Sequence, residues 1–168
     1  LAVFQQALDE VDRKQDPDLY ELILAELISS AWWDAQTYPI AKEAIDELDL
    51  DALHGGLGSE ILLGTMAHYE YQLGLRRERA VELARRALAP GNLLASGSIA
   101  FIYAATALRG SGLPDEAVSI FNEAIAQARR RGDIFNVAFM LMWRGYWQTR
   151  RGDLRAAVAD LREALDLC

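Results

Sequence analysis

The feature that most constrains this chain is an alanine that recurs at nearly constant spacing. Ala41, Ala80, Ala117 and Ala157 are separated by 39, 37 and 40 residues. The positions four and seven residues after each alanine also carry apolar or small side chains, which is the spacing of one helix face. A self-similar period of this length is typical of proteins built from stacked helical units.

A second helix can be placed before each alanine. Twelve to sixteen residues upstream, bulky and small side chains alternate at helical spacing, as in Phe101 with Ala105 and Leu141 with Gly145. Small residues let two helix backbones approach closely, and large ones fill the neighbouring groove. We therefore predict an all-α fold of tandem antiparallel helix pairs. The chain would form a single helical-repeat domain over residues 1–168, with repeats at 18–49, 59–88, 93–131 and 134–167.

Capping residues place the helix ends. Pro17 suits the first turn of a helix, Asp16 before it is a candidate N-cap, and glycines 132 and 152 suit left-handed helix ends. The sequence predicts nine helices, near 1–13, 18–33, 38–49, 59–74, 77–88, 93–110, 114–131, 134–151 and 154–167. Helix 1–13 would be the trailing helix of a preceding repeat, so we expect the chain to be a fragment of a longer protein.

Charge and composition narrow the environment. The net charge is −8, yet residues 1–75 hold 3 basic and 15 acidic side chains and residues 76–168 hold 14 and 10. The weak positive balance of the second part predicts no direct binding of nucleic acid. No segment has the roughly 18 consecutive apolar residues that predict a membrane span. The single cysteine, Cys168, leaves no internal disulfide, so we expect a cytoplasmic protein.

Several short motifs have structural explanations. The tripeptide Arg-Gly-Asp occurs at 131–133 and 151–153, where arginine suits a helix end, glycine the residue after it, and aspartate the cap of the next helix. The segment His54–Gly58 is rich in glycine but lacks the lysine of a P-loop, so it predicts a connection after which Ser59 and Glu60 start the next helix. His68 lies at a helix crossing, and we expect its imidazole to be packed there and hydrogen-bonded to a neighbour.

No cluster of residues predicts chemistry. The histidines, the cysteine and the carboxylates show no metal-ligand spacing, and no serine has a base placed near it by a motif. The carboxylates of Asp9, Glu10, Glu43, Asp46 and Glu47 are expected on the surface. We assign no catalytic residue, no metal site and no cofactor to this segment, and we do not expect an enzyme.

The alanine offsets resemble the tetratricopeptide repeat, in which a small residue faces the partner helix and a large one follows four positions later. The resemblance implies a right-handed α-solenoid whose first helices line a concave wall. Many aromatic side chains of this sequence belong to those helices: Trp32, Trp33, Tyr69, Tyr71, Trp143, Tyr146 and Trp147. The resemblance selects as groove residues Glu26, Trp33, Tyr69, Gln72, Thr106, Arg109, Tyr146 and Arg150. An aromatic surface with arginine at its rim suits a peptide or an anionic small molecule, but the same residues could simply pack in the core.

A narrower resemblance covers about residues 60–168. The segments 124–133 (AIAQARRRGD) and 151–165 (RGDLRAAVADLREAL) look like the helical-repeat region of large ATP-binding transcription regulators of the LuxR type, similar to the maltose regulator. This implies a sensor and oligomerisation region, with ATP bound only by a separate upstream domain. The expected partners are a protein or peptide, a small-molecule inducer, or further copies through the terminal helices. The alternative is a general peptide-docking adaptor unrelated to transcription.

Overall fold

The computed structural model describes residues 1–74 and 76–168, and within these residues it contains helices and no strand. No described helix combines the length and the apolar character that crossing a bilayer requires. The helices are α1 Ala2–Glu10, α2 Pro17–Ala31, α3 Tyr38–Asp46, α4 Leu57–Gln72, α5 Arg77–Leu88, α6 Asn92–Ser96, α7 Ile99–Gly110, α8 Pro114–Arg131, α9 Ile134–Arg151 and α10 Leu154–Asp166. The predicted all-α class is confirmed.

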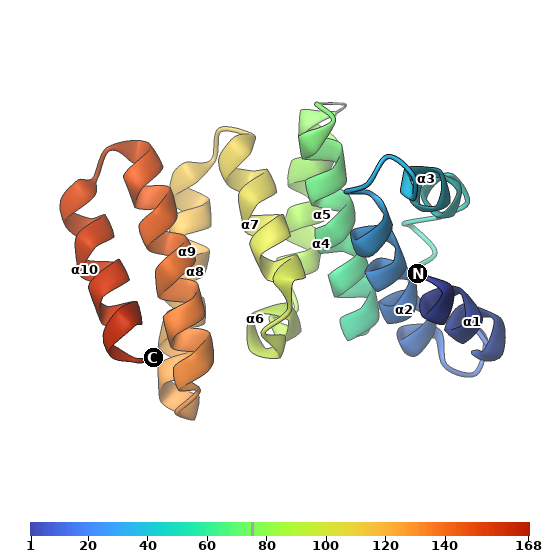
Figure 1. Cartoon of the computed structure of the whole chain (residues 1–168), viewed down its shortest axis with the longest axis horizontal. Coiled ribbons are helices and arrows are strands. Elements are labelled where there is room, and N and C mark those ends of the chain that lie inside the picture. The colour runs from blue at the N-terminus through green and yellow to red at the C-terminus, as the bar shows by residue number, and fades with distance from the viewer. Residues whose placement is uncertain (75) are drawn as a thin grey trace.

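The helices are stacked along the long axis, with α1 and α3 beside α2 at one end, α4, α5 and α7 in the middle, and α10 at the other end (Figure 1). Neighbours in the sequence pack together, as α2 does with α3, α4 with α5, α7 with α8, and α9 with α10. Helices α2, α4 and α7 also pack against one another in series, and α8 contacts α9. A continuous apolar core therefore runs from Leu24 to Ala164.

Small residues occupy the close approaches between helices. Ala41, Ala80 and Ala117 are completely buried. At Gly64, an added Cβ would lie 2.7 Å from the carbonyl oxygen of Ala100, so α4 and α7 approach too closely for a side chain there. The predicted role of the small side chains is thus confirmed at these positions, because close backbone contact depends on their size.

The prediction of one continuous helix over 93–110 is wrong. Residue Gly97 adopts a left-handed conformation, with φ 69°, and separates α6 from α7. The hydroxyl of Ser98 accepts a hydrogen bond from the backbone N of Ala100 and caps α7. Helix α6 is held at its own start by Glu60, whose carboxylate accepts hydrogen bonds from Asn92 Nδ2 at 2.6 Å and from Leu93 N at 2.8 Å. The apolar period continues through the break, which is why the pattern alone did not reveal it.

Some helix ends also differ from the prediction. Helices α1, α2 and α3 end at Glu10, Ala31 and Asp46, two or three residues before the predicted ends, and α4 starts at Leu57 rather than at residue 59. Asp16 is the N-cap residue of α2, as predicted, but its side chain makes no capping hydrogen bond. Asp18 instead accepts a hydrogen bond from Gly58 N at 2.7 Å, which satisfies a donor in the first turn of α4.

The two Arg-Gly-Asp segments are helix junctions, as predicted. Gly132 and Gly152 are left-handed, with φ 69° and 82°, at the ends of α8 and α9. Asp133 accepts a hydrogen bond from Asn136 N at 3.1 Å, and Asp153 accepts one from Ala156 N at 3.2 Å. The bonds from Asn136 lower the pKa of Asp133, because they favour its charged form.

The glycine-rich connection is tied to α2 by a buried carboxylate. Glu21 accepts a hydrogen bond from His54 N at 3.0 Å and another from the hydroxyl of Ser59. Gly55 N donates to Ser59 Oγ at 2.8 Å. The prediction that Ser59 and Glu60 simply start a helix is therefore incomplete, because both are buried and each joins two parts of the chain.

Candidate functional site

A cavity of about 430 Å³ lies among the first helices of the pairs, which contribute most of its aromatic side chains. Its walls come from α4, α7 and α9 and from the residues directly after α2. The lining residues are Trp33, His68, Tyr71, Gln72, Ile99, Ile102, Tyr103, Thr106, Arg109, Trp143, Tyr146 and Trp147. This volume lies in the usual range of small-molecule sites.

The packing of the helices explains where the cavity forms. Helix α8 packs against both α7 and α9, whereas α7 and α9 are not among the closely packed helix pairs. Large side chains from α7 and α9 therefore meet across a space that no backbone fills. A space bounded by rings, with polar groups such as those of Gln72, Thr106 and Arg109 among them, can accept a ligand that contains an apolar ring.

The wall is built from rings that contact one another. The imidazole of His68 stacks on Tyr103, with ring centres 4.6 Å apart and planes 16° apart. Trp143 meets Tyr146 edge to face, with ring centres 6.0 Å apart. Behind the lining residues, Trp32 lies 5.6 Å from His68 and extends the aromatic cluster toward α2. Such contacts hold flat side chains in fixed orientations.

His68 is a buried polar group within this wall. Its side chain is 5% exposed, and its Nε2 lies 3.0 Å from Nε2 of Gln72. The other ring nitrogen, Nδ1, is buried without a partner in the described part of the chain. Burial lowers the pKa of His68 to about 4, so the ring is neutral at pH 7. The expected hydrogen-bonded, packed histidine is confirmed, with half of its hydrogen-bonding capacity unused.

Arg109 places a positive charge at the same cavity. Its guanidinium carbon lies 5.4 Å from the ring centre of Trp147, which is itself 1% exposed. Arg109 Nε is buried without a hydrogen-bond partner, and no ion pair joins this side chain to any carboxylate of the described residues. Trp143 Nε1 is a second buried donor without a partner among them. The site thus combines aromatic walls, one cation and unused donors.

The structure brings together five of the eight groove residues selected from the sequence. Trp33, Gln72, Thr106, Arg109 and Tyr146 all line the cavity. The other three, Glu26, Tyr69 and Arg150, do not line it.

Tyr69 requires a correction, because it lies behind the cavity wall rather than on its surface. It is 6% exposed, its ring stacks on Trp32 at 5.7 Å, and its hydroxyl lies 3.2 Å from that of Tyr38. Burial raises the pKa of Tyr69, and the hydrogen bond with Tyr38 adds to the rise. Tyr69 therefore packs in the core.

Two principal wall residues, Tyr103 and Trp143, were not selected from the sequence. Both lie fourteen residues before a recurring alanine, Tyr103 before Ala117 and Trp143 before Ala157. The offsets taken from the tetratricopeptide resemblance, fifteen residues before the alanine for Glu26 and eleven or fewer for the others, pass over this position. An aromatic residue at the same offset in successive units was the signal that could have identified them.

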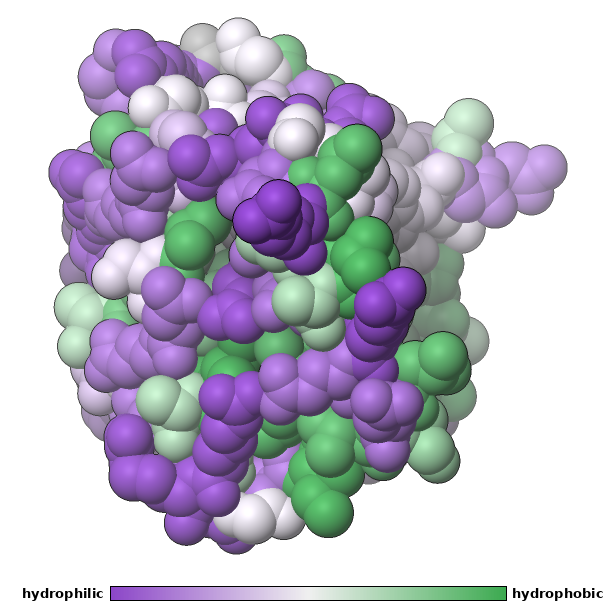
Figure 2. Space-filling model, turned by 90° about the vertical axis from the view of Figure 1, so that its left-hand side faces the viewer, coloured by the Kyte–Doolittle hydropathy of each residue, from purple (hydrophilic) through white to green (hydrophobic). Residues whose placement is uncertain are grey.

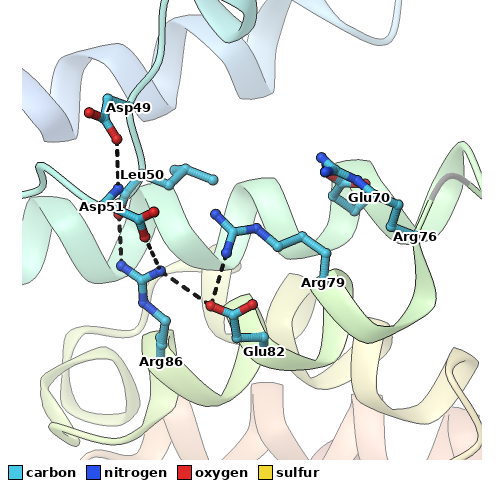
Figure 3. Close-up of polar contacts among 8 residues, drawn as sticks. All are labelled: Asp49, Leu50, Asp51, Glu70, Arg76, Arg79, Glu82 and Arg86. Atoms are coloured by element: carbon cyan, nitrogen blue, oxygen red, sulfur yellow. Dashed lines mark hydrogen bonds and ion pairs between the residues drawn. The ribbon is translucent and has the colours of Figure 1, made fainter.

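A second hollow, of about 420 Å³, is polar, and its charges are largely satisfied. Arg86 donates to Asp51 Oδ1 at 3.1 Å and to the carbonyl oxygen of Leu50 at 2.7 Å, and so joins α5 to the segment after α3 (Figure 3). Glu82 pairs with Arg79 at 2.9 Å in the same network. These partners already occupy one another, so this hollow is a weaker candidate for a binding site.

The two ends of the molecule carry apolar surface. Figure 2 shows the end formed by the last helices, where hydrophobic side chains run between polar ones. On α10, Leu154, Val158, Leu161 and Leu165 are 61%, 45%, 40% and 75% exposed and share one face. At the opposite end, a groove of about 600 Å³ lies among α1, α2 and α3, with leucines and Ile40 in its lining beside carboxylates.

No group of three or more potential metal ligands occurs within residues 1–74 and 76–168. No family model matches the sequence, and comparisons with the curated proteins and with the solved structures find no match either. The candidate site is therefore argued from its own geometry.

Proposed function

We propose that this chain is a helical-repeat scaffold that binds a ligand in the aromatic cavity. The observation that carries the proposal is the convergence of rings from separate helices around one space that they do not fill, with Tyr103, Trp143 and Tyr146 as its principal walls. The space opens to solvent, with Trp33 63% and Tyr146 48% exposed, so these rings are accessible to a ligand and are not simply core.

The scaffold itself is proposed to be a tetratricopeptide-like solenoid. Three observations support this: the buried alanines at regular spacing, the packing of successive helices, and the series of contacts α2–α4–α7. In such a stack each unit contacts its neighbours, and the first helices share one wall. The lining of the cavity by α4, α7 and α9 agrees with that arrangement.

A neutral apolar dye tests the binding proposal. Nile red titrated into the protein should bind with increased fluorescence, and Tyr103→Ala and Trp143→Ala should each weaken binding by about tenfold, because each removes a wall. Phe135→Ala is the matched control, since Phe135 is 76% exposed on α9 and does not line the cavity. Circular dichroism establishes that each variant is folded. Equal dye affinity in all four proteins would reject the cavity as a binding site.

The resemblance of residues 124–133 and 151–165 to LuxR-type regulators motivates a biological setting for the scaffold. In that setting a protein, peptide or small-molecule inducer would bind the wall and shift the population of regulator states. The proposal fails if the gene encodes no nucleotide-binding P-loop upstream and no helix-turn-helix downstream. A peptide-docking adaptor with other interaction modules is the competing setting.

A second candidate function, end-to-end self-association, is favoured by the two apolar ends. The α10 face carries exposed Arg155 and Arg162 beside its leucines, whereas the groove at the other end is lined by three carboxylates, of Asp9, Glu43 and Glu47, and one cation, Arg13. The complementary charge favours α10 of one copy in the groove of another, which is a head-to-tail contact.

Sedimentation equilibrium tests this contact through variants at either end. Leu165→Glu places a charge on the α10 face, and a Glu43→Arg, Glu47→Arg double variant reverses the charge of the groove. Each variant alone should be monomeric at concentrations at which the wild type associates, and their equimolar mixture should form dimers but no longer species. A monomeric wild type at up to about 200 µM would contradict the proposal, since that places any Kd outside the micromolar range.

A further inference from the structure

We infer that the aromatic cavity binds a flat aromatic carboxylate, with Arg109 as the residue that receives the carboxylate group. This inference rests on the proposed binding function and narrows its ligand to one chemical class. It depends on three polar groups that the fold leaves unused at the cavity: those of Arg109, Trp143 and His68.

Arg109 supplies the charge. The guanidinium of Arg109 is half-buried and has no carboxylate partner in the described residues, and its Nε is withdrawn from water without a replacement, which is costly for the folded chain. Its contact with Trp147 holds the group at the cavity. A ligand carboxylate would complete the pair, and its two oxygens match the planar fork of the guanidinium.

Trp143 and His68 supply further donors. The indole N–H of Trp143 can only donate, and it has no acceptor among the described residues. Nε2 of His68 faces the amide nitrogen of Gln72, which donates. In a neutral ring the proton then lies on Nδ1, so this unpartnered nitrogen is also a donor. Both nitrogens are buried, so they reach the oxygens of a ligand only when these lining side chains move.

The remaining features select the rest of the ligand. Arg109 is the only cationic side chain that lines the cavity within the described residues, so a single negative charge is matched and a phosphate dianion is not. An ammonium ligand is disfavoured, because Arg109 would repel it and the described lining contains no carboxylate to pair with it. The parallel rings of His68 and Tyr103 and the edge of Trp143 favour a flat ring system over a branched chain.

Three ligands of nearly equal shape but different charge test whether the cavity prefers a carboxylate. Isothermal titration calorimetry would measure 2-naphthoate, its neutral amide 2-naphthamide, and the cationic 2-naphthylmethylamine against the whole chain. We expect 2-naphthoate to bind at least about tenfold more tightly than the amide, and the amine to bind most weakly, because only the carboxylate completes the guanidinium pair.

Arg109→Met removes the charge and keeps the length of the side chain. The variant should bind 2-naphthoate and 2-naphthamide equally, whereas Arg130→Met, at an exposed position on α8 outside the cavity, should keep the wild-type preference. If all three ligands bind the wild type alike, or if Arg109→Met keeps the preference for the carboxylate, the inference is overturned. Binding of Nile red that depends on Tyr103 would still support the proposed function in that case, so the two can fail separately.

The carboxylate could come from a small molecule or from the C-terminus of a peptide. A pentapeptide ending in tryptophan, measured with a free and with an amidated C-terminus, distinguishes these sources. Tighter binding of the free acid than of the amide identifies a peptide end as a ligand of the same class. If neither peptide binds and 2-naphthoate does, the ligand is a small aromatic acid.

Discussion

Besides exposed arginines such as Arg130, two groups of arginines can be compared: those that bridge helices and the one at the cavity. On the outer helices and their ends, arginines bridge neighbouring elements through carboxylates. Arg85 on α5 donates to Glu116 on α8 through two bonds of 2.9 and 2.8 Å, and Arg151 on α9 pairs with Asp115 on α8 at 3.1 Å. At the cavity, Arg109 lies over a tryptophan and has no carboxylate partner in the part of the chain that the structure describes.

This difference separates the arginines that stabilise the fold from the arginine at the cavity, which does not. A paired arginine helps to fix how two helices align, so its removal lowers the free energy of unfolding. A donor that is withdrawn from water and has no partner destabilises the folded state by about 1–3 kcal/mol. Such a donor is therefore a candidate contact for a bound ligand. His68 at the cavity resembles Arg109 in this respect, because its buried Nδ1 has no hydrogen-bond partner among the described residues.

The largest effect is expected at the most buried pair of the first group. Arg144 donates to both carboxylate oxygens of Asp160 at 2.6 and 2.7 Å, and their side chains are 17% and 9% exposed. Arg144→Met should lower the free energy of unfolding by about 3–5 kcal/mol, because it leaves a buried carboxylate without its partner. Urea denaturation measures the change, with Arg130→Met as the exposed control. A loss below about 1 kcal/mol would mean that the paired arginines are not structural.

The second prediction concerns the pH dependence that His68 imposes. The pKa of His68 is lowered to about 4 in the folded state, whereas an unfolded chain has the ordinary value of about 6.5. Between these values the unfolded state binds more protons, so stability falls as the pH decreases from 6.5 toward 4. His68→Phe removes this contribution, which is at most about 3 kcal/mol.

The measurement is the difference in unfolding free energy between pH 7 and pH 4, in the wild type and in His68→Phe. The carboxylates titrate in both proteins, so their contribution largely cancels in the comparison. A smaller loss of stability in the variant is expected. Equal losses would show that His68 is solvated rather than buried in the aromatic wall.

The sequence allowed much of the architecture to be predicted, because local signals coincide with the helix ends. The predicted boundaries of α5, α8 and α9 are those of the structure, and prolines and glycines mark several of them. The break at Gly97 was missed although left-handed Gly97 and the Ser98 cap are local signals, because the apolar period continues through them. The sequence also did not show that Glu60, more than thirty positions away, holds the start of α6. Capping by a distant carboxylate leaves no periodic signal.

The candidate site was predicted only in part, for a related physical reason. Repeat offsets identify which positions face the inner wall, and they located Arg109 and Tyr146. They do not reveal which side chains meet across the space between two helices, because that depends on how far α7 and α9 diverge. Tyr103 was missed because the offsets taken from the resemblance pass over its position, and Tyr69 was included although it packs between Trp32 and Tyr38.

The third prediction tests the cavity arginine for stability rather than for binding. Arg109→Met should change the free energy of unfolding by less than about 1 kcal/mol, since it removes no ion pair, and the lost contact with Trp147 is offset by the removal of a buried donor without a partner. Thermal and urea denaturation without ligand measure the effect. A loss comparable with that of Arg144→Met would contradict the division between the two groups of arginines. A small gain would agree with it, because a donor without a partner is removed.

The smallest effect is expected at an exposed pair of the first group. Arg129 on α8 bonds with Glu163 on α10, and the two side chains are 51% and 44% exposed. A double-mutant cycle with Arg129→Met and Glu163→Gln should give a coupling energy of about 0.2–1 kcal/mol that decreases in high salt, because water screens both charges. A coupling as large as that of Arg144 with Asp160 would mean that burial does not set the strength of these pairs. In that case burial would also not distinguish Arg109 at the cavity from an unpaired arginine on the surface.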